Sequence, residues 1–225
     1  MADGRPEMLA ALADRVRVTA TGLDHPCRVA VDGITASGKT TLADELAAVL
    51  AADGRGVDRL SMDGYHHPRA HRHRRGRDSA DGYYEDAYDF AAFAGDVLVP
   101  LGDGARPRYR PAIIDLATDE PAPDEPKELA PDGVLVVDGS FLQRPVLASH
   151  WDLVVWVAVP FAVAEARGVA RDADLLGGRD EAERLFRTRY HAAGRRYVGE
   201  VGPEARADVV VDNSDATAPF LRDDT

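Results

Sequence analysis

Gly33-Ile34-Thr35-Ala36-Ser37-Gly38-Lys39-Thr40 matches the phosphate-binding pattern G-x-x-x-x-G-K-[ST]. The run at residues 28–32 predicts a buried strand before it, and residues 41–50 predict an amphipathic helix after it. Glycines let backbone N–H groups surround a phosphate, and the helix N-terminus adds partial positive charge. The stretch therefore predicts a nucleoside triphosphate site formed by Gly33, Ala36, Ser37, Gly38, Lys39, Thr40 and Thr41.

Lys39 is one of only two lysines among the 27 basic residues of the chain. A lysine ammonium is a compact point charge that reaches phosphate oxygens, a task that suits a planar guanidinium poorly. We therefore expect Lys39 to take part in catalysis and Thr40 to offer its hydroxyl to Mg²⁺.

Composition limits the classes of partner. The 225 residues suit a single domain with a small lid. A net charge of −12 argues against nucleic-acid or anionic-membrane binding, although a homo-oligomer stays open. The single Cys27, and the lack of a signal-peptide pattern or long apolar run, favour the reducing cytoplasm.

Strand and helix patterns alternate along the chain. Short apolar runs at 57–62, 134–137, 153–159 and 207–212 predict further strands, several of them buried on both faces. Helical spacing at 86–98, 161–172 and 180–193 predicts helices between them. The pattern predicts an α/β fold of the P-loop NTPase type, with a doubly wound, mostly parallel sheet flanked by helices.

Two aspartates follow apolar strands, at the edge where ligands bind in such sheets. Asp138 comes after four apolar residues and is expected to hold Mg²⁺ with Thr40; the alternative is an ordinary Asp-Gly turn. Asp63 ends the second strand and is the candidate base that accepts the proton of an attacking hydroxyl, unless it too is only a turn residue.

Residues 65–82 form an insertion rich in histidine and arginine. It is compatible with a metal site, a nucleic-acid contact, a solvated basic loop, or an arm over an anionic substrate or neighbouring subunit. The solvated loop is the simplest interpretation, because neither a cysteine nor a basic overall charge supports the first two. His66 is open between a substrate contact and a loop residue.

Arg167 and Arg171 lie four residues apart on one face of a predicted helix. We expect them to belong to a lid, at about residues 165–182, that closes over the triphosphate. A solvated, salt-bridged helix face is the alternative.

The ordered set of motifs resembles the uridine kinase and phosphoribulokinase group of P-loop kinases. The matching pieces are the phosphate loop, Asp63-Gly64-Tyr65-His66, residues 136–139, Arg171-Asp172, Arg189-Tyr190, Tyr197, Pro203 and residues 207–211. The resemblance implies that Asp63 is the base, that Tyr65 and Tyr109 border the phosphate acceptor, and that Arg179 reaches the hydroxyls of the acceptor. It also places Arg167 and Arg171 in the lid. It also implies that ATP and Mg²⁺ are used.

The function expected from this resemblance is transfer of the γ-phosphate of ATP to a hydroxyl of a small molecule. Uridine or a related nucleoside is the first candidate acceptor. Pantothenate-type or sugar-phosphate acceptors, or a non-catalytic nucleotide-binding module, are the alternatives. A GTPase is disfavoured, since Lys127 is the only other lysine and does not lie in an Asn-Lys-x-Asp element.

Overall fold

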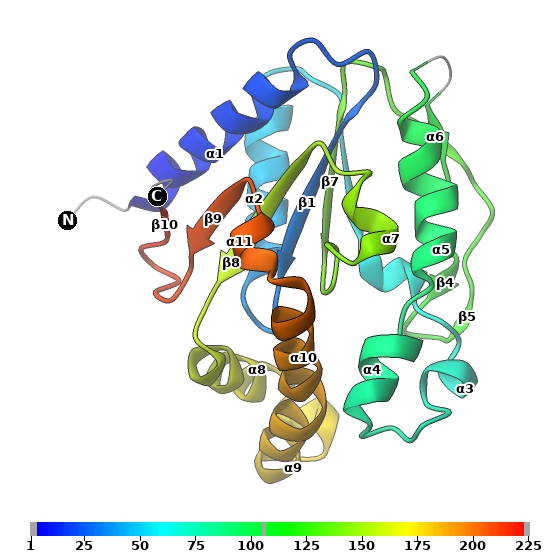
Figure 1. The fold of residues 1–225 in the computed structure, drawn as a ribbon, viewed down its shortest axis with the longest axis vertical. Helices are drawn as coiled ribbons and strands as arrows, with labels where there is room; N and C mark the ends of the chain where they lie inside the picture. Colours follow the sequence, from blue (N-terminus) through cyan, green and yellow to red (C-terminus); the bar gives the residue numbers. More distant parts are fainter. Residues whose placement is uncertain (1–3, 105–106, 223–225) are drawn as a thin grey trace.

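A six-stranded sheet forms the centre of the molecule in a computed structural model that describes residues 4–104 and 107–222 (Figure 1). The strand order is β10-β9-β8-β1-β7-β2. All neighbours pair in parallel except β10 with β9. The strands are β1 (Cys27–Gly33), β2 (Val57–Ser61), β7 (Val134–Gly139), β8 (Leu153–Ala158), β9 (Val209–Asp212) and β10 (Phe220–Leu221).

Helices cover both faces of the sheet, because alternate strand residues point to opposite sides. Val29 and Val31 pack with α1 (Gly4–Ala20) and α2 (Lys39–Ala51) on one face. Ala30 faces the other side. The helices there are α4 (Ala80–Asp86), α5 (Phe90–Phe93), α6 (Val99–Leu101), α7 (Pro145–Ala148) and α10 (His191–Val201). The doubly wound α/β fold predicted from the sequence is confirmed.

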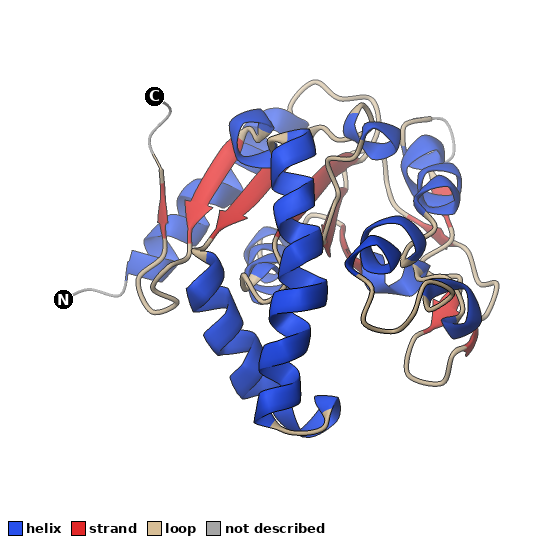
Figure 2. Cartoon of the chain, turned by 60° about the horizontal axis from the view of Figure 1, so that its bottom comes forward, coloured by secondary structure: helices blue, strands red, loops and turns tan. Residues whose placement is uncertain are grey.

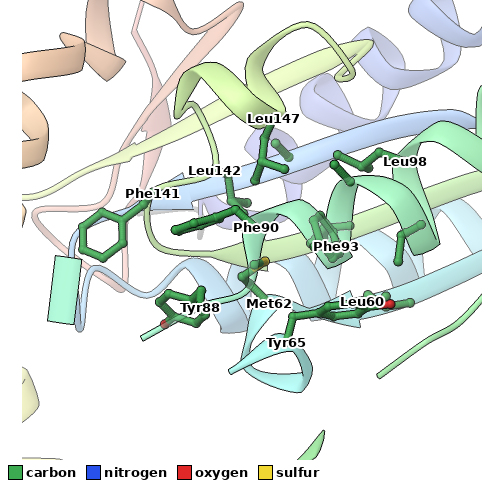
Figure 3. Close-up of a cluster of buried hydrophobic side chains, with 14 of the residues drawn as sticks. Leu60, Met62, Tyr65, Tyr88, Phe90, Phe93, Leu98, Phe141, Leu142 and Leu147 are labelled. Carbon is green, nitrogen blue, oxygen red and sulfur yellow. The ribbon is translucent and has the colours of Figure 1, made fainter. Parts of the chain in front are cut away.

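The second face carries a core rich in aromatic side chains (Figure 3). Met62 and Tyr65 of the 3₁₀-helix η1 (Met62–Tyr65) point toward Phe93 of α5. The rings of Tyr65 and Phe93 meet edge-on with their centroids 5.0 Å apart. This core fixes η1, and with it Asp63, directly beyond the end of β2.

A helical hairpin extends beyond the edge of the sheet at which β1 ends (Figures 1 and 2). It consists of α8 (Phe161–Leu176), α9 (Arg179–Leu185) and the π-helix η3 (Phe186–Tyr190), which runs on into α10. Gly177 and Gly178 reverse the chain with φ of 99° and 107°, values that suit glycine. A Cβ on Gly168 would lie 2.1 Å from the Phe186 ring, so this glycine permits the close packing of the hairpin.

The middle of the chain is more divided than its sequence pattern predicts. The helical spacing at 86–98 becomes the end of α4, then α5, which Asp89 caps, and the π-helix η2 (Ala94–Leu98). The insertion contains α3 (Arg69–Arg72) and reaches into α4. Short strands pair as β3 (Arg108–Tyr109) with β6 (Lys127–Glu128) and β4 (Ile114–Asp115) with β5 (Glu120–Pro121); α11 (Pro203–Arg206) precedes β9. None of the helices in the described ranges is long and apolar enough to cross a membrane.

Candidate active site

The phosphate loop connects β1 to α2, and its conformation depends on two glycines. A Cβ on Gly33 would lie 2.5 Å from Ser37 Oγ and 3.1 Å from the Val157 carbonyl oxygen. Gly38 has φ of 92°, and a Cβ there would lie 2.5 Å from Asn213 Nδ2. The motif therefore needs glycine at both positions for steric as well as conformational reasons.

A residue from the far end of the chain holds the loop in place. The side-chain amide of Asn213, just after β9, donates to the Ser37 carbonyl oxygen at 2.8 Å. Ala36 has a positive φ of 66°, a conformation that non-glycine residues adopt rarely. The buried Ser37 Oγ has no hydrogen-bond partner among the described residues. The loop is thus preformed by contacts outside the motif.

The first turn of α2 carries Lys39, Thr40 and Thr41. Its N-cap residue is Gly38, which has no side chain to accept a hydrogen bond from the first N–H groups of the helix. These N–H groups can therefore bind a ligand. Lys39 Nζ lies back over the loop and donates to the Ile34 carbonyl oxygen at 3.3 Å. The partial positive charge at the N-terminus of α2 and the charge of the Lys39 ammonium therefore both lie at the phosphate loop.

Thr40 and Asp138 come together as the sequence predicts for a magnesium site. Thr40 Oγ1 donates to Asp138 Oδ2 at 2.6 Å, and Asp138 is buried at the end of β7. Two hard oxygen donors at this spacing fit the ligand preference of Mg²⁺, and Thr40 and Asp138 would hold such an ion. Arg59 holds the second carboxylate oxygen, with Nη2 2.7 Å from Oδ1, and so orients Asp138.

A cavity of about 310 Å³ lies beside the phosphate loop and is lined by residues of α2, α8 and the segment after β9. Arg167 and Arg171 both reach this cavity from α8. Arg167 donates from Nη1 to the Asn213 carbonyl oxygen and from Nη2 to that of Ser214, each at 2.9 Å. Arg171 is more exposed and donates two hydrogen bonds to the carboxylate of Asp172, at 2.7 and 2.8 Å.

Asp63 lies in η1 with a 60 % exposed side chain. Tyr88 donates its hydroxyl to Asp63 Oδ1 at 3.3 Å. The ring of His66 packs on Tyr88 with the centroids 4.1 Å apart, and His66 Nδ1 lies 3.1 Å from the Asp63 carbonyl oxygen. Burial lowers the pKa of His66, so its imidazole is neutral at pH 7.

Tyrosine hydroxyls connect Asp63 with the phosphate loop. The hydroxyl oxygen of Tyr83 lies 3.3 Å from Thr35 Oγ1, within hydrogen-bond distance. Burial, together with the nearby Tyr83 hydroxyl and Asp63 carboxylate, raises the pKa of Tyr88 well above its usual range. Arg171 lines the cavity beside the phosphate loop. Its pKa is raised mainly by the hydrogen bond with Asp172 and also by the charge of Asp63. Asp63, Arg171 and the phosphate loop thus lie around one region.

Three residues expected at the acceptor lie elsewhere or are buried. Tyr65 is fully buried and donates its hydroxyl to the Arg110 carbonyl oxygen at 2.6 Å. Tyr109 is also buried and donates to Asp58. Arg179 is 75 % exposed at the tip of the hairpin and pairs with Glu183 at 3.1 Å. Their hydroxyls and guanidinium are engaged in these contacts rather than directed at Asp63.

The basic insertion folds against acidic residues. Arg74 and Arg75 both pair with the buried Asp86, and Arg72 pairs with Asp119 at 2.6 Å. Within residues 4–104 and 107–222, no group of three or more His, Cys, Asp or Glu side chains could hold a metal ion. Arg72, Arg74 and Arg75 thus pair with acidic residues of the chain itself.

Asp32 is a fully buried carboxylate, although its sequence position indicates only a strand residue before the phosphate loop. It accepts hydrogen bonds from the Tyr197 hydroxyl at 2.5 Å, the Gly33 N–H at 2.8 Å and Gln143 Nε2 at 3.3 Å. Burial raises its pKa to about 6 despite these donors and the nearby charge of Lys39. Its position directly before the motif was the only sequence signal.

We expect Asp32→Asn to change how stability depends on pH. Because the folded pKa of about 6 exceeds the unfolded value, the contribution of Asp32 is fully present below about pH 4 and is lost as pH rises through 6. Asp32→Asn should therefore raise the free energy of unfolding at pH 8 by about 1–3 kcal/mol, with little difference at pH 4.

Urea denaturation at several pH values measures this effect, with the exposed Asp14→Asn on α1 as the control. A lower stability of Asp32→Asn at pH 8 would mean that Tyr197, Gln143 and Lys39 require an ionised carboxylate.

Comparison with solved structures identifies the fold. No protein-family model and no curated protein sequence matches the chain. A protein from Bacillus stearothermophilus described as a possible uridine kinase superposes with a TM-score of 0.72 at 24 % identity, covering 91 % of this chain and 97 % of its own. A protein from Silicibacter, provisionally described as a fructose transport system kinase, gives 0.69 at 28 % identity, with coverage of 85 % and 94 %.

A more distant match is D-glycerate 3-kinase from Cryptococcus neoformans, with a TM-score of 0.56 at 12 % identity over 82 % of this chain and 87 % of its own. These structures share the parallel sheet and its flanking helices with this chain. The chain has the α/β fold of the P-loop kinases.

Proposed function

We propose that the protein is an ATP-dependent kinase that transfers the γ-phosphate to a hydroxyl of a small molecule. The observation that carries the proposal is that the candidate magnesium site and the candidate base lie at the same edge of the sheet. The Thr40–Asp138 pair lies at the phosphate loop, and Asp63 is connected to the same loop through Tyr88, Tyr83 and Thr35. The kinases among the structural neighbours are consistent with this activity.

In this mechanism the loop N–H groups and Lys39 bind the phosphates of ATP. Thr40 and Asp138 would hold Mg²⁺, which supplies positive charge against the phosphate oxygens. The acceptor oxygen forms a bond to the γ-phosphorus while the bond from that phosphorus to the β–γ bridging oxygen breaks. ADP leaves with the electron pair of that bond, and Asp63 takes the acceptor proton late in the transfer.

The acceptor candidates fall into three chemical groups. A nucleoside such as uridine is favoured by the sequence resemblance and by the description of one neighbour. Pantothenate-type and sugar-phosphate acceptors are the alternatives that the sequence resemblance leaves open. A sugar-type or hydroxy-acid acceptor fits the descriptions of two other neighbours.

A coupled assay of ADP release across nucleosides, pantothenate, hydroxy acids and sugar phosphates tests the proposal. We expect acceptor-dependent turnover that requires ATP and Mg²⁺. Tight ATP binding without ADP release for any acceptor would instead favour a nucleotide-binding module.

We expect Arg171→Ala to lower kcat by at least about tenfold, while ATP affinity changes by less than about threefold. Arg171 lies at the phosphate-loop cavity and is well exposed, and its one ion-pair partner in the described part of the chain is its neighbour Asp172. A cation that approaches the phosphates on closure stabilises the transition state more than bound ATP.

Steady-state kinetics measures this, with Arg187→Ala as a matched control, because Arg187 is equally exposed and pairs with Glu165. Arg171→Lys should recover only part of kcat, since an ammonium lacks the paired donors of a guanidinium. A loss of thermal stability with kcat unchanged would assign Arg171 to a structural ion pair.

A further inference from the structure

Arg189, in η3, is a buried arginine without a carboxylate partner. The residue is only 8 % exposed, and its Nε is buried with no hydrogen-bond acceptor. Across the described part of the chain, no hydrogen bond or ion pair to its guanidinium is formed. The Nε–H group is thus cut off from water without an acceptor, and the described residues supply no carboxylate for this cation.

The other buried arginines behave differently. Arg28 pairs with Asp152 at 2.9 Å, and Arg72 pairs with Asp119 at 2.6 Å. Proteins seldom bury a charge without a partner, because the lost hydration is not repaid. The unpaired state of Arg189 therefore points to a partner that is not part of the chain.

Aromatic rings fix where this cation lies. The guanidinium carbon is 5.3 Å from the ring centroid of Tyr83 and 5.1 Å from that of Tyr190. Tyr83 contacts Thr35 of the phosphate loop, and it also acts on Tyr88, the donor to Asp63. The charge of Arg189 acts on His66 as well, although burial is the main cause of the lowered pKa there.

Arg189 therefore lies on the side of the phosphate loop from which Tyr83 and Tyr88 lead to the candidate base Asp63. In the proposed mechanism the acceptor binds on this side. The triphosphate already has the N-terminus of α2 and Lys39 within the loop itself. Ring faces hold a guanidinium in position but leave its in-plane N–H donors free, and those donors match the oxygens of a phosphate or carboxylate.

We propose that Arg189 binds an anionic group, a phosphate or a carboxylate, on the phosphoryl acceptor. This inference rests on the proposed kinase function and narrows it. The acceptor is then a sugar phosphate or a hydroxy acid, including pantothenate-type molecules, rather than a neutral nucleoside. Arg189 determines specificity by pairing with the negative charge of the acceptor. A neutral acceptor cannot supply this charge and leaves the buried cation unpaired, which makes its binding less favourable.

A binding experiment tests the site without needing turnover. The protein is saturated with Mg²⁺ and a non-hydrolysable ATP analogue, so that the γ-phosphate position is filled, and inorganic phosphate is titrated by calorimetry. We expect the wild type to bind phosphate, and Arg189→Gln to bind it at least about tenfold more weakly. Arg195→Gln is the matched control: it removes one positive charge that lies over a ring, that of Phe161, but is exposed.

Three results would overturn the inference. The first is equal phosphate binding by the wild type and Arg189→Gln, and the second is no phosphate binding by the wild type. The third is a tenfold loss of affinity for the ATP analogue with phosphate binding intact, which would assign Arg189 to the γ-phosphate. Circular dichroism verifies folding, and Arg189→Lys, which retains the charge, should keep part of the binding.

Matched acceptors test specificity: ribose 5-phosphate against ribose, glycerate against glycerol, and pantothenate against its alcohol. We expect the charged member of a pair to be the better substrate, and Arg189→Gln to raise its KM by about tenfold or more without raising the KM for ATP. Efficient turnover of neutral acceptors, unaffected by Arg189→Gln, would overturn this inference and leave the kinase function standing. No turnover by any acceptor, with phosphate still bound through Arg189, would count against the kinase function alone.

Discussion

Lys39→Ala is expected to lower kcat by about 10³-fold while the protein stays folded. Charge spreads over the oxygens of the transferring phosphoryl group, and Lys39 supplies a compact cation at the phosphate loop. Among residues 4–104 and 107–222, the only hydrogen bond of its side chain is a 3.3 Å contact to the Ile34 carbonyl oxygen, so its removal costs the fold little. The effect should therefore be in turnover and not in the thermal midpoint.

The second lysine of the chain gives a direct control. Lys127 is exposed in β6, far from the loop in sequence, and Lys127→Ala should retain full activity. Steady-state kinetics and thermal unfolding of both variants separate the two effects. If Lys39→Ala keeps kcat within about tenfold of the wild type, the lysine is not the main source of transition-state charge.

Asp63→Asn is expected to retain nucleotide binding and to lose about 10²-fold or more in acceptor phosphorylation. The amide has nearly the same shape as the carboxylate but cannot take the hydroxyl proton. Tyr88 can still donate to the amide oxygen, so the hydrogen bond that positions this side chain is preserved. The variant therefore tests proton acceptance more than geometry.

The comparison is made with a verified acceptor, and Asp14→Asn on α1 serves as an exposed aspartate outside the site. ATP affinity is measured in parallel by titration. Near-normal turnover by Asp63→Asn would place the base elsewhere and leave Asp63 as a turn residue of η1.

The sequence by itself determined the elements whose signals are local. Continuous apolar runs predicted β7 and β8, and residues 28–32 before the phosphate motif predicted β1. The glycine pattern predicted the loop between β1 and α2. Because parallel strands end at the same edge, Asp138 and Thr40 could be expected to meet, and their side chains lie 2.6 Å apart. The position of Asp63 beyond β2 followed from the same rule.

Only the tertiary structure decided which polar side chains are buried and what they contact. Tyr65 and Tyr88 lie in the same part of the chain, yet one hydroxyl is tied to the Arg110 backbone and the other reaches Asp63. Asp32 receives its shortest hydrogen bond from Tyr197, which is 165 residues away. No local pattern encodes such pairs.

Arginine shows this limit most clearly. Arg74 and Arg189 are the same residue type, but Arg74 pairs with the buried Asp86, whereas Arg189 lies over the rings of Tyr83 and Tyr190 and pairs with no carboxylate among the described residues. Whether a charge is solvated, paired or left for a ligand depends on which distant segments pack around it, and the free energy of a charge depends strongly on that surrounding. The local sequence fixes the charge, whereas the packing of the folded chain fixes its partner.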